Sequence, residues 1–272
     1  MRGAVRMLGT AARPIATGLR RLSATNGLTI IGWHRVDGDS DGLSTGVDDF
    51  RRHLDVLDEW GATVLPLDEA VAGLEAGTLP DRAVALTFDD GYASVLETAW
   101  PILLDRGLPA TLFAVSRCLT DDLPFAWDVH EPEQARLRLA RADELLDAAS
   151  TGLDIGSHTV SHPWLPRLDA DELKRELVDS RVALEELLGR TVTSLAYPTG
   201  GWNRTVRAAS ADAGYRIAIT VDRGLNTRRT PHLSLRRAFV PPEPEDLRLI
   251  LDGGYTMLRP LDSWRRREGP SW

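Results

Sequence analysis

Residues 84–92 read VALTFDDGY, and this stretch decides the fold. The apolar, β-prone run Ala83–Phe88 predicts a short buried strand. Two adjacent carboxylates, Asp89 and Asp90, follow the strand, and Gly91 then lets the chain turn away from it. Carboxylates at the mouth of a buried strand are costly unless something offsets their charge, and a bound metal cation is the commonest way to do so.

Histidines that would complete a metal site come later in the chain. His158 and His162 lie in the sequence GSHTVSHP of residues 156–163. Together with Asp90 they make three protein ligands, and three ligands leave a coordination position open, as in catalytic metal sites. Each motif alone has an ordinary alternative, because paired Asp residues often form turns or helix caps and H-x-x-x-H lacks the central Glu of H-E-x-x-H.

The composition bounds the class of protein. The chain has 272 residues, 43% of them hydrophobic, which suits one large α/β domain with a sizeable core. A net charge of −8 argues against nucleic acid as a partner. The single cysteine, Cys118, excludes an intramolecular disulfide. No run of 18 apolar residues occurs, so the sequence predicts no membrane-spanning helix.

The N-terminal segment has a composition of its own. Residues 1–25 carry five arginines and no acidic residue. Their apolar residues recur at alternating spacings of three and four, which predicts a basic amphipathic helix able to contact an anionic membrane surface. A solvated basic tail is an equal alternative. We recognise no signal peptide, and therefore expect a location in the cytoplasm or at the inner face of the membrane.

Predicted strands alternate with predicted helices from residue 27 onward, which favours a largely parallel sheet in one domain. In the predicted helix 49–60, Asp48 is the candidate cap and His53 is expected at the surface. The polar motifs lie directly after strands, where α/β folds place their sites.

A metal-activated water that attacks a carbonyl needs a base, an oxyanion donor and a general acid. Asp89 is the candidate base, and a backbone N–H in the turn 198–201 is the candidate oxyanion donor. His34 follows another predicted strand and is the candidate acid, with a pKa expected near or above the working pH. Trp202 is either a platform for sugar stacking or ordinary packing.

The combined motifs resemble a known family. TFDDG at 87–91 and SHTVSH at 157–162 are similar to the first two motifs of the polysaccharide deacetylases, the NodB-homology proteins of carbohydrate esterase family 4. The sequence LAYPTGG at 195–201 is similar to the third motif. The resemblance covers residues 27–245, leaving 1–26 as a basic segment and 246–272 as a C-terminal helix and tail. It implies a distorted (β/α)7 barrel and metal-dependent removal of an N-acyl group, usually acetyl, from an amino sugar.

The resemblance also implies roles for individual residues. Asp89 matches the base, and the metal ligands match Asp90, His158 and His162. The backbone amide of Thr199 stands where the family places its oxyanion donor. Substrate binding is assigned to Tyr197, Pro198 and Trp202. The implied cofactor is Zn²⁺, with Co²⁺, Ni²⁺ and Mn²⁺ as alternatives.

Two departures from the family pattern point to a subgroup. Ala196 stands where many members have an arginine that orients the base, and residues 233–237 lack the late histidine that serves as the acid. Biofilm-type deacetylases carry an early acid histidine in a segment that WHRV, residues 33–36, resembles, and this assigns the acid to His34. In the same subgroup a late arginine matches Arg237, which we therefore expect beside Asp89.

The sequence as a whole favours a hydrolase that acts on an N-acetylated glycan or a glycan precursor. Two alternatives stay open. One is a carbohydrate-binding barrel without catalytic activity, and the other is the same chemistry on a lipid-linked or non-sugar amide.

Overall fold

The computed structural model describes residues 27–38, 42–120, 125, 127–128, 137–254, 256 and 262. The predicted N-terminal segment 1–26 lies outside these residues, as does most of the predicted C-terminal tail. Within the described residues, no helix is both long and apolar enough to cross a membrane.

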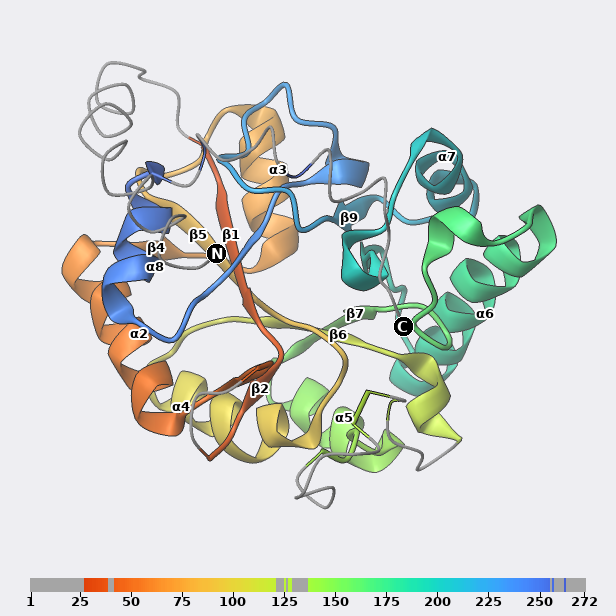
Figure 1. The fold of residues 1–272 in the computed structure, drawn as a ribbon, viewed down its shortest axis with the longest axis horizontal. Helices are drawn as coiled ribbons and strands as arrows, with labels where there is room; N and C mark the ends of the chain where they lie inside the picture. The colour runs from red at the N-terminus through yellow and green to blue at the C-terminus, as the bar shows by residue number, and fades with distance from the viewer. Residues whose placement is uncertain are drawn as a thin grey trace.

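The main sheet is a parallel sheet that curls into a barrel (Figure 1). Its strands follow the order β10-β1-β5-β6-β7-β8-β9, and β4 also pairs with β5. A single parallel bridge from Ile219 to Leu235 links β9 to the segment just before β10, and β10 pairs with β1. The strands are β1 Thr29–Trp33, β4 Thr63–Val64, β5 Ala83–Phe88, β6 Thr111–Ala114, β7 Asp154–Ser157, β8 Ser194–Ala196, β9 Ile217–Ile219 and β10 Ala238–Phe239. The predicted single-domain (β/α)7 barrel is confirmed.

Helices surround the sheet, as Figure 1 shows. They are α2 Val47–Trp60, α3 Leu67–Ala76, α4 Trp100–Asp105, α5 Ala142–Ser150, α6 Ala170–Leu188, α7 Arg204–Asp212 and α8 Pro244–Leu251. The longest of these helices, α6, has a start signal at its N-terminus and a stop signal at its C-terminus. Asp169 and Glu172 form a reciprocal capping box, and Gly189 ends the helix with a left-handed φ of 63°. A two-stranded sheet of β2 Arg35–Val36 and β3 Ser44–Thr45 follows β1.

Strand β5 divides the core into two parts. Val84, Leu86 and Phe88 pack in the larger apolar cluster, which includes side chains of α2, α4, α5 and α6. Ala83 and Ala85, on the opposite face of the strand, belong to a second cluster. Because side chains alternate along a strand, this second face continues through Thr87 to Asp89. The sequence of β5 therefore delivers the Asp89 carboxylate to the interior of the barrel.

Helix α2 corrects two predictions. It begins at Val47 after Gly46, and Asp48 lies in the first turn without acting as a side-chain cap. His53 is fully buried instead of lying at the surface. Its Nδ1 accepts a hydrogen bond from Trp33 Nε1 at 3.4 Å, and its Nε2 donates to the carbonyl of Pro242 at 3.0 Å. Burial lowers the pKa of His53, so the ring is neutral and can satisfy both partners.

The segment after the Asp pair differs from the single helix, interrupted by Pro101, that its sequence predicts. The structure instead has a π-helical turn, Val95–Ala99, followed by α4. Trp100 N–H donates to the carbonyl of Val95, and Pro101 falls in the first turn of α4, where its missing N–H costs least.

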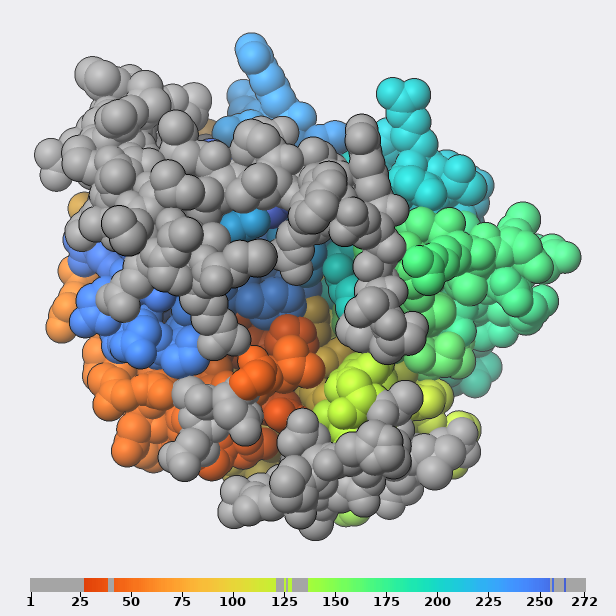
Figure 2. Space-filling model, viewed as in Figure 1, coloured from red at the N-terminus to blue at the C-terminus, as the bar shows by residue number. Residues whose placement is uncertain are grey.

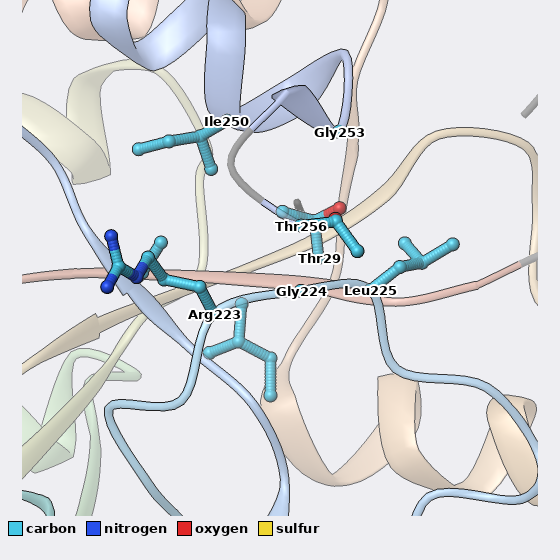
Figure 3. Close-up of a pocket in the computed structure, with 9 residues that line it drawn as sticks. Thr29, Arg223, Gly224, Leu225, Ile250, Gly253 and Thr256 are labelled. Atoms are coloured by element: carbon cyan, nitrogen blue, oxygen red, sulfur yellow. The ribbon is translucent and has the colours of Figure 1, made fainter. Parts of the chain in front are cut away.

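A small cavity lies at the amino ends of the strands (Figure 3). Thr29 and Ile30, at the start of β1, line it together with Arg223, Leu225 and Ile250. The polar motifs singled out in the sequence follow the carboxyl ends of the strands, so this cavity is separate from them.

Candidate active site

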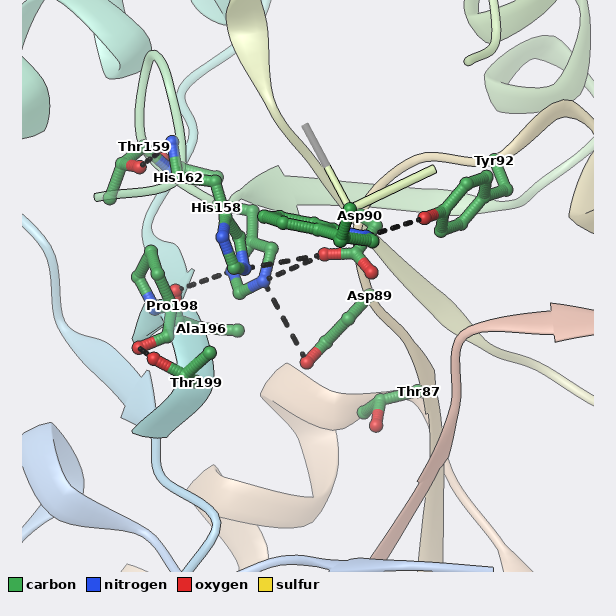
Figure 4. A network of polar contacts seen from close by, with 12 residues as sticks. Thr87, Asp89, Asp90, Tyr92, His158, Thr159, His162, Ala196, Pro198 and Thr199 are labelled. Carbon is green, nitrogen blue, oxygen red and sulfur yellow. Dashed lines mark hydrogen bonds and ion pairs between the residues drawn. The ribbon is translucent and has the colours of Figure 1, made fainter. Parts of the chain in front are cut away.

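Four strands deliver the candidate residues to one end of the barrel. His34 follows β1, Asp89 and Asp90 follow β5, His158 follows β7, and Thr199 lies just beyond β8. Figure 4 shows the carboxylates of Asp89 and Asp90 facing His158, with Thr199 nearby. The carboxyl ends of parallel strands meet at one edge, which explains why residues far apart in the chain gather there.

Asp90, His158 and His162 form the one group of potential metal-binding side chains found among the described residues. One ligand atom from each lies within 4.8 Å of the others. His158 Nε2 and His162 Nε2 each lie 3.4 Å from Asp90 Oδ1. His158 Nδ1 donates to the carbonyl of Ala196 at 2.7 Å, which leaves Nε2 as the ring nitrogen that faces Asp90. All three side chains are buried.

The charges around this group suit a cation. Burial raises the pKa of Asp90, but hydrogen bonding to His158 and the charges of the histidines together lower it by more. The net pKa is therefore far below the usual range. Burial lowers the pKa of His162 to about 4, which keeps that imidazole neutral, the form that binds metals. Burial lowers the pKa of His158, but the charges of Asp89 and Asp90 and the hydrogen bonds to Asp90 and Ala196 together raise it by more. Two nitrogen ligands and one carboxylate fit a divalent transition metal.

Asp89 is held by Arg237 inside the barrel. Arg237 Nη1 donates to Asp89 Oδ1 at 2.6 Å and to Thr87 Oγ1 at 3.1 Å, while Nη2 donates to Asp89 Oδ2. Burial raises the pKa of Asp89, but the charges of Arg237 and His158 and the hydrogen bonds from Arg237 together lower it by more, so this carboxylate is ionised. Arg237 lies beside Asp89 as predicted; its role in orienting the base stays a proposal.

Gly32 makes room for this ion pair. A Cβ atom at Gly32 would lie 3.0 Å from Thr87 Oγ1 and 3.2 Å from Arg237 Cδ, closer than ordinary packing allows. The guanidinium also lies over the ring of Phe239, with its Cζ 4.6 Å from the ring centroid. Arg237 reaches the base from the segment before β10, whereas the family's usual arginine would come from position 196, which is alanine in this chain.

His34 is half-buried and stacks on Phe239, with ring centroids 4.2 Å apart. Burial lowers its pKa more than the charges of Asp90 and Asp89 raise it. The predicted pKa near or above the working pH is therefore wrong for the protein without a bound cation: desolvation dominates, and the ring is neutral at rest. Its assignment as the acid stays a prediction and requires that His34 gain a proton during the reaction.

The turn after β8 separates the residues assigned to substrate. Thr199 is exposed and has a φ of 50°, whereas Tyr197 is fully buried and donates its hydroxyl to the carbonyl of Leu233 at 2.9 Å. That placement argues against a substrate contact by the Tyr197 side chain. Pro198 is buried as well, and Trp202 is half-buried and packs against the core, which supports the packing alternative for Trp202.

The backbone of the site is strained. Among the described residues, five that are not glycine have a positive φ, and four of them belong to this site: Asp90, Thr159, His162 and Thr199. Such conformations cost about 1–3 kcal/mol each and persist only where the surroundings enforce them. At His162 part of that enforcement is local, because its backbone N–H donates to Thr159 Oγ1 at 3.2 Å.

Sequence reasoning missed three contacts around the site. In the first, Trp127 packs edge-on to His162, with ring centroids 5.0 Å apart, and in the second, Tyr92 donates to Asp128 Oδ2 at 2.6 Å. The third is made by Glu176 on α6, which binds the backbone between the two histidines. Neighbouring residues gave no signal for these contacts, because each joins segments that meet only in the folded barrel.

Known proteins resemble this chain in sequence. A family model described as polysaccharide deacetylase matches residues 76–218, slightly more than half of the chain. The Bacillus subtilis protein YxkH is 26% identical over 216 residues, which are 79% of this chain and 72% of that protein. A poly-β-1,6-N-acetyl-D-glucosamine N-deacetylase of Staphylococcus epidermidis is 24% identical over 201 residues, which are 71% of this chain and 66% of that protein.

Solved structures share the fold. The Streptococcus pyogenes deacetylase PplD, solved in complex with acetate, superposes with a TM-score of 0.72 at 24% identity, covering 84% of this chain and 99% of that one. IcaB from Ammonifex degensii gives a TM-score of 0.68 at 22% identity, covering 85% of this chain and 97% of that one. The chain therefore belongs to the polysaccharide deacetylase family and is a hydrolase of amide carbon–nitrogen bonds.

Proposed function

We propose that this protein removes N-acetyl groups from the amino sugars of a glycan or glycan precursor in a metal-dependent reaction. The observation that carries the proposal is the pairing of Asp89 with Arg237 directly beside the group Asp90, His158 and His162. An ionised carboxylate next to a cation site is what hydrolysis of an amide by water requires. The relatives named for N-acetylated substrates, including the Staphylococcus epidermidis enzyme, support the class of substrate.

The cation held by Asp90, His158 and His162, which we propose to be zinc, would act as a Lewis acid toward water and the amide carbonyl. Asp89 Oδ2 lies 3.9 Å from His158 Nε2 at the edge of the group, which supports the proposal that Asp89 accepts the proton of the attacking water. Arg237 keeps Asp89 ionised and fixes the direction of its lone pairs.

Two further groups complete the proposed reaction. The backbone N–H of Thr199, in the exposed turn after β8, donates to the oxygen that becomes negative as the carbonyl is attacked. His34, neutral at rest, takes up the proton that the attacking water gave to Asp89 and passes it to the nitrogen of the leaving amine as the carbon–nitrogen bond breaks. The amine and acetate then leave as separate products.

Acetate release from defined N-acetylglucosamine oligomers tests the proposal. The zinc-loaded protein should release acetate, and Asp89→Asn should retain the metal and the fold but lose activity by about a hundredfold or more. A protein that binds the oligomers but releases no more acetate than Asp89→Asn would instead be a carbohydrate-binding barrel. Parallel assays on lipid-linked amino sugars would identify the remaining alternative.

A further inference from the structure

Glu176 binds the loop between the two histidine ligands. This residue lies on α6, and its Oε2 accepts backbone N–H bonds from Val160 at 2.9 Å and from Ser161 at 3.0 Å. Its Oε1 accepts the hydroxyl of Ser161 at 2.6 Å. All three donors belong to the turn that separates His158 from His162. One carboxylate therefore fixes the middle of the ligand loop.

The same helix face also fixes the start of the loop. Ser180 lies four residues after Glu176, one helical turn further on, and its Oγ is 2.8 Å from the Oγ of Ser157, the residue before His158. Tyr215 fastens the helix from the other direction, because its hydroxyl donates to the carbonyl of Leu177 at 2.9 Å. Helix α6 forms one flank of the molecule in Figure 2 and is capped at both ends, so it provides a rigid frame for the loop.

His162 depends on that frame more than His158 does. The ring of His158 is oriented by the hydrogen bond from Nδ1 to Ala196, whereas the buried Nδ1 of His162 has no hydrogen-bond partner in the part of the chain that the structure describes. Aromatic contacts and the backbone must therefore orient the His162 ring. That backbone has a positive φ at Thr159 and at His162, so it relaxes unless other groups hold it.

We propose that Glu176 is a positioning residue for the metal site: it holds the strained turn at Val160 and Ser161 and thereby places His162 for binding a divalent cation. The inference rests on the proposed metal-dependent function and deepens it. Groups that orient metal ligands without touching the metal typically change metal affinity by about 10- to 100-fold when they are removed.

Cobalt binding to the purified full chain tests this role, because Co²⁺ reports its ligand geometry through its visible absorption. Glu176→Ala should bind Co²⁺ about tenfold or more weakly and show altered absorption bands. Glu176→Gln should recover most of the affinity, because its amide oxygen can accept both backbone N–H groups and its NH₂ can donate to Ser161. Glu176→Asp, which is one methylene shorter, should resemble Glu176→Ala. The matched control is Glu186→Gln, an exposed position on the same helix, which should behave as the unmodified protein.

The outcomes separate this inference from the proposed function. If the unmodified protein binds Co²⁺ and releases acetate but the Ala, Asp and Gln variants all retain its affinity and spectrum, Glu176 has no positioning role. A Glu176→Ala variant that loses only the thermal stability of the cation-free protein would equally refute that role. If Glu176→Ala does not fold, equal Co²⁺ affinities of the Asp and Gln variants would overturn the proposal. Failure of the unmodified protein to bind Co²⁺ at all would instead refute the proposed function.

Discussion

Arg237 and Asp89 are 148 positions apart in the sequence, yet they form a two-pronged ion pair inside the barrel. Their side chains are only 0% and 4% exposed, so solvent does little to screen the interaction. A buried pair of this kind adds little net stability, but removing one partner leaves the other charge uncompensated. The ionisation and orientation of the candidate base, Asp89, therefore depend on a residue that lies near the end of the domain in the sequence.

Replacement of Arg237 by methionine tests that dependence. Arg237→Met should lower the free energy of unfolding by about 3–5 kcal/mol, because the Asp89 charge stays buried without its partner. It should also lower kcat by about a hundredfold, because the base loses its orientation. Denaturant unfolding and acetate release measure the two effects. In the double variant with Asp89→Asn, the stability loss should be clearly smaller than the sum of the single losses; strict additivity would show that the pair is not coupled.

The second prediction concerns the metal ligands. His158→Ala should lose tight binding of zinc, because it removes one of three ligands and the one oriented by Ala196. Elemental analysis of the purified variant checks this directly. A full equivalent of zinc held at unchanged affinity would contradict the assignment, and His232→Ala, outside the candidate site, is the control that should retain the metal.

The third prediction concerns the acid. His34→Ala should keep its metal and its substrate affinity but lower kcat by about 10²- to 10⁴-fold, as expected when proton transfer to the leaving group is lost. Steady-state kinetics on a defined oligomer separates kcat from KM. An unchanged kcat would remove His34 from the mechanism, and the proton would then have to come from solvent.

The fourth prediction is a pH dependence of stability that originates at His53. Burial lowers the pKa of His53 in the folded protein, while the unfolded chain keeps a pKa near 6.5. Below about pH 6.5 the unfolded state binds the proton more readily, so stability should fall as the pH decreases. His53→Gln should be less stable at pH 7.5 but flatter below pH 6.5, and unfolding curves across this range measure both. Parallel pH profiles for the two proteins would refute the role of His53.

The sequence was sufficient for the frame of the fold and for much of the site. Strand β5 has the predicted bounds, and Arg237 lies beside Asp89 as expected. These predictions succeeded because apolar runs locate strands and because parallel strands gather their carboxyl ends. His53 failed for a different reason: it follows Phe50 by three positions and precedes Leu57 by four, the spacing of the buried face, but its polarity was given more weight than its position.

Other features depend on tertiary placement and have no local signature. Glu176 belongs to a charged helix face, and nothing in its neighbourhood in the sequence distinguishes it from Glu186, which is exposed. The lowered pKa of His34 results from a competition between burial and two nearby carboxylates, and only the folded geometry decides it.

The seam between β10 and β1 carries a consequence for how the enzyme forms. The family match covers residues 76–218 and contains Asp89, Asp90, His158 and His162, whereas His34 and Arg237 lie outside it on either side. His34 and Arg237 come together only when β1 pairs with β10, where Ile31 lies beside Ala238, roughly 200 positions later in the chain. Pairings between residues so far apart in the sequence have the highest loop-closure entropy cost. We therefore expect a chain in the course of folding to assemble its cation-binding residues before it gains Arg237, so that it holds a metal earlier than it hydrolyses an amide.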